Sequence, residues 1–208
     1  MKKNIQYIFI VVIGLLGYNS VYIKKLSEVK NNAPKSFDAI EFSQKLWTGK
    51  MPAKIDSAVD LSALIQAVSS GKEAALKKYT HALDIGNYRY AFIKTQGIVT
   101  AVNEDEVLIR VSGADSVMNN VLATEYIYGN AIRDASGLVD VKDFPNTSDL
   151  NSISEEINKI VRTSVVPPFR KTVKKGDKIH IIAAVQLNKE HIKWNGLELL
   201  PVRLQIVH

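Results

Sequence analysis

The feature that most constrains the fold of this chain is a change in hydrophobic periodicity near residue 88. Before that point the apolar residues of 61–68 lie at positions i, i+3, i+4 and i+7, the spacing of a helix face. After it, the β-branched residues Val107, Ile109 and Val111 alternate with Leu108 and Arg110, the period of two that is typical of a strand. Helices followed by strands are typical of an α+β fold and not of βαβ alternation.

Three helices are predicted before the change, and together they form a helical subdomain over 37–80. The first begins near Phe37 and ends at Gly49 and Pro52. The second begins after Asp60, a plausible N-cap, and stops at Ser69-Ser70-Gly71. A third, shorter helix is expected over 73–79.

Five strands are predicted over residues 88–208, with a helix between the third and the fourth. That helix carries the capping-box pair Ser152 and Glu155 and is expected to end at Pro167-Pro168. Five short strands with a helix in this place match a five-stranded OB-like small β-barrel with an inserted helix. The predicted strands are Tyr88–Val102, Glu106–Val111, Val121–Tyr128, Ile179–Leu187 and Leu199–Val207.

The N-terminal segment has the pattern of an export signal. Lys2 and Lys3 precede a mostly apolar run that reaches Ile23, about the 20 residues that cross a hydrocarbon core. Because no small-residue cleavage site follows, we expect an uncleaved transmembrane signal anchor over 1–25, then a polar stalk over 26–35. A single soluble domain over 36–208 would then lie in the periplasm, held by a single-pass helix in the inner membrane.

The composition excludes several function classes. The 27 Lys and Arg residues exceed the 21 Asp and Glu residues, but no basic run is interleaved with aromatics, so we expect no nucleic-acid partner. There is no cysteine, and the four histidines are far apart, so neither a metal site nor a cofactor is predicted. No nucleophile, dinucleotide or nucleotide motif is present, and no catalytic residue is identified.

The densest group of polar residues lies in segment 129–146, which is expected to be loop-rich. Planar Arg, Asp and Asn groups can hydrogen-bond the vicinal hydroxyls of a sugar. The same residue types are also what turns require, and neighbouring Arg and Asp residues can simply pair within the loop. The candidate ligand-binding residues are Asn130, Arg133, Asp134, Asp140, Asp143 and Asn146.

The string Gly129 to Leu138, with Asp143 to Asn146 and the closing Leu200-Pro201-Val202, resembles the predicted periplasmic lipoproteins called domain of unknown function 2291. The resemblance implies a lipid-anchored periplasmic domain, often associated with sugar transport systems of the ABC type, with no established activity. Leu15-Leu16-Gly17 resembles the start of a lipobox, but Tyr18 stands where the lipidated cysteine would be. The apolar segment itself is therefore expected to hold the protein in the membrane.

Two functional hypotheses follow. The first is a non-enzymatic, membrane-anchored periplasmic accessory or binding protein that contacts transporter components or a carbohydrate. The alternative is an envelope glycan hydrolase or lyase that uses the carboxylates of residues 133–146, namely Asp134, Asp140 or Asp143, as acid and base. A purely structural spacer is the third possibility. An open cleft at 129–146 would favour a ligand over a structural loop.

Overall fold

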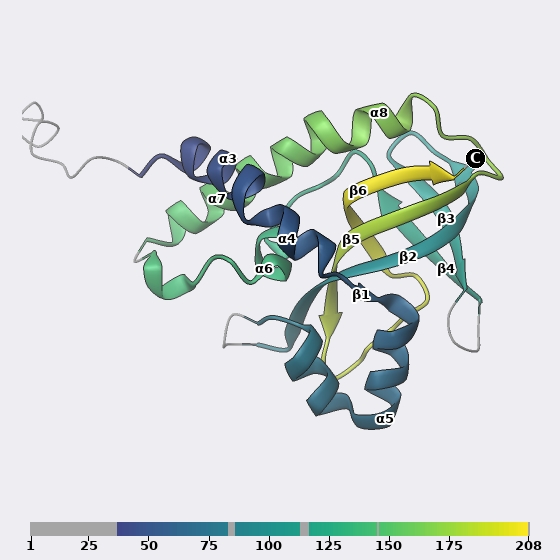
Figure 1. Cartoon of the computed structure of the whole chain (residues 1–208), viewed down its shortest axis with the longest axis horizontal. Helices are drawn as coiled ribbons and strands as arrows, with labels where there is room; N and C mark the ends of the chain where they lie inside the picture. Colours follow the sequence, from purple (N-terminus) through teal and green to yellow (C-terminus); the bar gives the residue numbers. More distant parts are fainter. Residues whose placement is uncertain (1–36, 83–85, 113–116, 145, 208) are drawn as a thin grey trace, which may run out of the picture. The chain divides into compact units, whose positions relative to one another are not determined.

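A computed structural model describes residues 37–82, 86–112, 117–144 and 146–207 of the chain (Figure 1). The predicted membrane anchor over 1–25 and stalk over 26–35 lie outside these residues. Among the helices of the described part, none combines the length and the apolar character needed to cross a membrane.

A strongly curved sheet closes on itself and forms the centre of the fold. The strand order is β2-β3-β4-β6-β5, and the sheet closes because the last strand, β5, also pairs with the first, β2. Closure is possible because β2 is long: its residues 88–98 pair with β5 and its residues 97–102 pair with β3. β4 and β6 pair in parallel, whereas the other four pairings within the barrel are antiparallel. The strands are β2 (Tyr88–Val102), β3 (Glu106–Ser112), β4 (Val117–Ala123), β5 (Lys178–Asn188) and β6 (Glu198–Val207).

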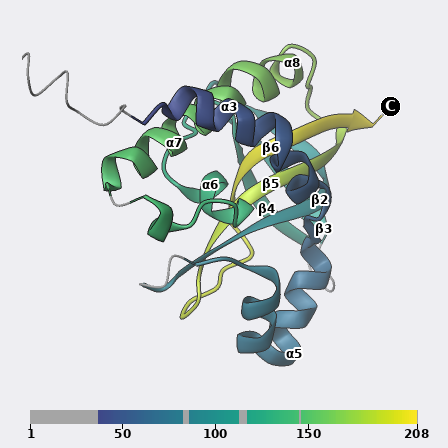
Figure 2. The same cartoon turned by 60° about the vertical axis from the view of Figure 1, so that its left-hand side comes forward.

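Alternation along these strands fills the barrel with apolar side chains. Val107, Ile109 and Val111 of β3 are fully buried in one cluster with inward residues of the other strands. Helices α5 (Leu61–Tyr79) and α8 (Val166–Arg170) lie on opposite sides of the barrel (Figures 1 and 2), and each contributes apolar residues to this cluster. A sixth strand, β1 (Val59–Asp60), pairs in parallel with β2.

A second apolar cluster lies between the outer face of the barrel and a layer of helices. Tyr90 and Phe92 from β2 and Leu200 from β6 pack there against buried residues of the helices. The helices of this layer are α3 (Ala39–Gly49), α4 (Met51–Asp56), α6 (Ala131–Ser136) and α7 (Thr147–Ile160). α6 contacts β2, β5 and α7, so it lies between the barrel and α7.

Of the helix ends predicted at prolines, one is confirmed and one is wrong. α3 ends at Gly49 as predicted, and Pro52 then occupies the first turn of α4, where a missing N–H costs nothing. Pro167 and Pro168, by contrast, begin α8, after a π-helical turn over Val161–Val165, and do not end the preceding helix. The predicted stop at residues 69–71 is a kink: Gly71 has φ −174° and ψ 83°, and α5 continues to Tyr79. The predicted N-cap is confirmed, since Asp60 accepts a hydrogen bond from the Ala63 N–H.

The third strand of the barrel, β4, begins four residues before its predicted start and also ends earlier than predicted. β4 ends at Ala123 because the N–H groups of Thr124 and Glu125 both bond to the Asp105 carbonyl, which turns the chain away from the sheet. Tyr126 and Tyr128, which alternation placed in the strand, are therefore in the following loop.

The expected loop over 129–146 is also partly wrong, because it contains α6 and a 3-10 turn over Val141–Asp143. The predicted capping box is wrong as well. Asn146 caps α7 by accepting a hydrogen bond from the Ser148 N–H, and Ser152 lies inside the helix.

Candidate functional site

The centre of the candidate site is α6, a helix of six residues that are all buried. It begins after Asn130 and ends at Gly137, whose φ of +61° is the left-handed conformation that commonly follows a helix. A side chain at Gly137 would also collide with the ring of His81, since a Cβ there would lie 2.5 Å from the ring. Glycine is thus required both to end α6 and to let the His81 segment approach it.

Two of the predicted site residues form a buried ion pair within α6. Arg133 Nε lies 2.7 Å from Asp134 Oδ1, and the side chains are only 4% and 1% exposed. Arg133 Nη1 also donates to the Leu150 carbonyl of α7 at 2.9 Å. The second oxygen of Asp134 accepts from Asn130 Nδ2, which also donates to the Tyr90 hydroxyl at 3.3 Å. These bonds join α6 to both the barrel and α7.

A cleft of about 530 Å³ opens between α6 and α7, lined mainly by residues with polar side chains; we call it the α6–α7 cleft. One face of α7 lines it, because Thr147, Asn151, Ser154 and Asn158 follow the i, i+4, i+7, i+11 spacing. Asn130 and Arg133 line the side formed by α6. Asn158 Nδ2 donates to the Gly129 carbonyl at 2.8 Å and so ties the two sides together.

Two exposed tyrosines lie in the loop that leads to this cleft. Tyr126 and Tyr128 are 61% and 57% exposed, and their ring centroids are 6.4 Å apart. Arg162 lies 4.9 Å from the centroid of the Tyr128 ring and also pairs with Glu155 at 2.7 Å. A smaller cleft of about 260 Å³ beside Tyr128 shares Gly129 and Asn130 with the α6–α7 cleft. The Tyr128 ring therefore lies beside the α6–α7 cleft, whereas Tyr126 lines neither of these two clefts.

The remaining predicted residues lie elsewhere. Asp140 and Asp143 line a separate cleft of about 560 Å³, together with Asp134 and His81. Asp140 accepts a hydrogen bond from the Lys142 N–H at 2.9 Å and thereby caps the 3-10 turn. Asn146 is exposed and caps α7. The six candidates are thus divided between two clefts and a helix cap.

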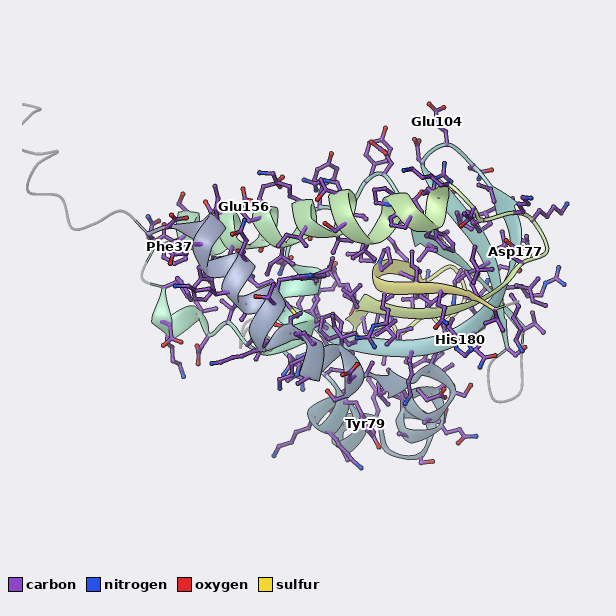
Figure 3. All side chains as sticks on the ribbon, turned by 45° about the horizontal axis from the view of Figure 1, so that its top comes forward. Phe37, Tyr79, Glu104, Glu156, Asp177 and His180 are labelled. Carbon is purple, nitrogen blue, oxygen red and sulfur yellow. The ribbon has the colours of Figure 1, made fainter. Side chains whose placement is uncertain are left out.

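Among the residues that the structure describes, the histidines do not gather in a metal-binding group. Partial burial lowers the pKa of His81 from its ordinary value of 6.5, and the positive charges of Lys54 and Arg89 lower it further. His180 projects from β5, well away from α7 with its Glu156 (Figure 3). Across the described ranges, no group of three or more His, Asp or Glu side chains is placed to hold a metal ion.

The polar face of α7 was not predicted from the sequence. Its four residues are spaced as a helix face, but the predicted capping box starts the helix at Ser152, which leaves Thr147 and Asn151 outside it. Recognition of Asn146 as the cap would have revealed the pattern, because it places all four residues on one helix.

Comparison with known proteins identifies both a family and a fold. The family model described as "Predicted periplasmic lipoprotein (DUF2291)" matches residues 11–205. The crystal structure of an OB-fold protein from Thermotoga maritima MSB8 is similar, with 27% identity and a TM-score of 0.72. The similarity covers 83% of this chain and 100% of that chain, and it supports the expected OB-like barrel.

A further solved structure, the Stn1-Ten1 complex of S. pombe, has 10% identity and a TM-score of 0.25. The match covers 64% of this chain and 68% of that chain, and a similarity this low supports no inference. No protein with a curated description matches.

Proposed function

The chain belongs to the DUF2291 family of predicted periplasmic lipoproteins, and from this premise we propose that it is a membrane-anchored periplasmic binding protein that holds a carbohydrate in the α6–α7 cleft. The N-terminal apolar segment would anchor it in the inner membrane, in place of the lipid that Tyr18 cannot carry. The domain described above would then face the periplasm.

One observation carries the carbohydrate proposal: hydroxyl and amide side chains line the α6–α7 cleft, and the exposed Tyr128 ring lines a smaller cleft that shares Gly129 and Asn130 with it. Sugars present hydroxyl groups, which hydroxyl and amide side chains can both donate to and accept from. They also present apolar C–H faces, which suit an aromatic ring whose other side is held in place. The cleft volume of about 530 Å³ lies within the range of small-molecule sites.

Calorimetric titration of the full-length protein with a panel of mono- and disaccharides tests this proposal. The detergent should carry no sugar headgroup, for example lauryldimethylamine oxide, because a glycoside detergent would compete for the site. Asn151→Trp should block the cleft and abolish binding. Ser152→Trp is the matched control, since Ser152 is exposed on the same helix but does not line the cleft, and it should leave binding unchanged. The absence of binding to every sugar would refute the carbohydrate proposal.

We also propose that the protein acts beside an ABC-type sugar transport system. Support comes from the family resemblance noted in the sequence and from the predicted anchor, which would keep the domain at the membrane surface. Cross-linking of the full-length chain in intact cells, followed by mass spectrometry, tests this contact. Transporter subunits should be enriched over a control with an unrelated anchored domain, and their absence would contradict the proposal.

The hydrolase or lyase alternative has less support. Glycoside hydrolysis needs two carboxyl groups that face one site about 5–10 Å apart. Asp134 is engaged by Arg133 and Asn130, and Asp140 is engaged by a backbone N–H. Release of reducing ends from an envelope glycan, lost in Asp143→Asn, would favour the enzyme over the binding protein.

A further inference from the structure

We infer that the ligand of the α6–α7 cleft is an acidic sugar whose carboxylate pairs with the guanidinium of Arg133. This inference rests on the proposed carbohydrate function and specifies the class of sugar.

Arg133 has hydrogen-bonding capacity that the protein itself does not use. Its Nε and Nη1 atoms donate to Asp134 and Leu150, but its Nη2 donates to no group among the described residues. The fully buried side-chain polar atoms without a partner in the described part are Asn120 Nδ2 and Thr124 Oγ1, so Arg133 Nη2 keeps some contact with solvent. Because Arg133 lines the α6–α7 cleft, a molecule in the cleft can reach this donor.

A carboxylate suits this donor better than a hydroxyl does. The unused Nη2 carries two N–H groups, and the charged oxygen of a carboxylate accepts from such a group more strongly than the neutral oxygen of a hydroxyl does. Because Arg133 is only 4% exposed, little water competes for its guanidinium, whose charge is shared with the buried carboxylate of Asp134.

The two acidic side chains nearest the cleft, Asp134 and Glu155, are each paired with an arginine, so neither is an uncompensated negative charge. Glu155 is the acidic side chain in the lining, and it is paired with Arg162 at 2.7 Å. Asp134 does not line this cleft, and its oxygens accept from Arg133 and Asn130. Thr147 and Asn151 make no side-chain hydrogen bonds within the described part, so both can bind the remaining oxygens of an acidic sugar.

Matched ligands test the inference on the unmodified full-length protein in lauryldimethylamine oxide. Each series contains a hexose, its uronic acid and the corresponding uronamide, for the gluco, galacto and manno configurations. In the configuration that binds, the acid should bind about tenfold more tightly than the amide, as expected for a charge-assisted pair. Equal affinities of acid and amide would overturn the inference and leave the carbohydrate proposal standing. Failure of all the series to bind would overturn both.

An added charge provides a second test that does not disturb Arg133. Thr147→Glu places a carboxylate at an exposed position of the lining, so the preference for acid over amide should fall about fivefold. Ser148→Glu adds the same charge at the next exposed position, outside the lining, and should keep the preference. An equal loss in both variants would attribute the preference to the general charge of the protein and would refute a role for the cleft.

Discussion

Both the backbone conformation and the packing at residue 137 require glycine. Its φ of +61° is unfavourable for other residues, and a Cβ there would lie 2.5 Å from the His81 ring. Gly137→Ala should therefore lower the free energy of unfolding by about 3 kcal/mol, the sum of backbone strain and overpacking. Urea denaturation measures this change.

Gly196→Ala is the matched control for backbone strain alone. Gly196 has φ +74°, but a Cβ there would meet nothing within 4 Å. Its substitution should cost about 1 kcal/mol. Equal costs at the two positions would show that the contact with His81 contributes nothing to stability.

His81 should make stability depend on pH. Burial, Lys54 and Arg89 hold its pKa below 6.5 in the folded state, so the unfolded chain binds more protons at this site. The associated stability is present above pH 6.5 and is lost as the pH falls from 6.5 through the lowered folded pKa. In His81→Gln the free energy of unfolding should decrease less across this window than in the wild type. His180→Gln is the control, and an NMR titration that gives His81 a pKa of 6.5 or above would contradict the prediction.

Among the helices and strands, α7 has two candidate N-terminal caps. The sequence offered Ser152 with Glu155 as a capping box, whereas the structure uses Asn146, whose Oδ1 accepts from the Ser148 N–H at 3.0 Å. Asn146→Ala should therefore cost about 1 kcal/mol, because it removes a cap. Ser152→Ala should change stability by less than about 0.5 kcal/mol, as for other exposed sites. Thermal or urea unfolding of the two variants compares them, and a larger loss at Ser152 would refute this start.

The strands and helices show which sequence patterns were sufficient to predict their boundaries. Strand alternation predicted β2, β3, β5 and β6 to within one or two residues, because one face of each strand must enter the barrel. The prolines were interpreted as helix ends, because the sequence alone does not show whether a proline follows one helix or occupies the first turn of the next. The end of β4 depends on the Asp105 carbonyl of another turn, which strand alternation does not specify.

At the scale of the whole molecule, the order of five strands and an inserted helix was enough to predict the barrel. The candidate site was only partly predictable. Asn130 and Arg133 were identified, but the other wall of their cleft belongs to α7, and only tertiary packing brings the two helices together. Asp134 and Arg133 are neighbours in sequence, yet they line different clefts, because successive residues of a helix point in different directions.

The N-terminal segment is expected to determine how the whole protein is attached to the membrane. Residues 5–23 form a mostly apolar run of about the length that crosses a bilayer, and there is no cysteine to carry a lipid. The wild-type protein should therefore remain in the membrane fraction after a carbonate wash. A chain that begins at residue 26, exported by a cleavable signal, should appear in the wash supernatant. Release of the wild-type protein would contradict anchoring by this segment.

Tyr18→Cys distinguishes an anchor that replaces a lipid from one that is unrelated to it. The change completes the Leu15-Leu16-Gly17-Cys pattern of a lipobox, so the lipoprotein-processing enzymes should attach a lipid at residue 18 and remove the residues before it. Mass spectrometry should then find a shorter, lipid-modified protein, still in the membrane fraction, while the wild-type chain keeps its first residues. If Tyr18→Cys remains unprocessed, the segment is a transmembrane anchor without the properties of a lipoprotein signal, and its resemblance to a lipobox has no functional meaning.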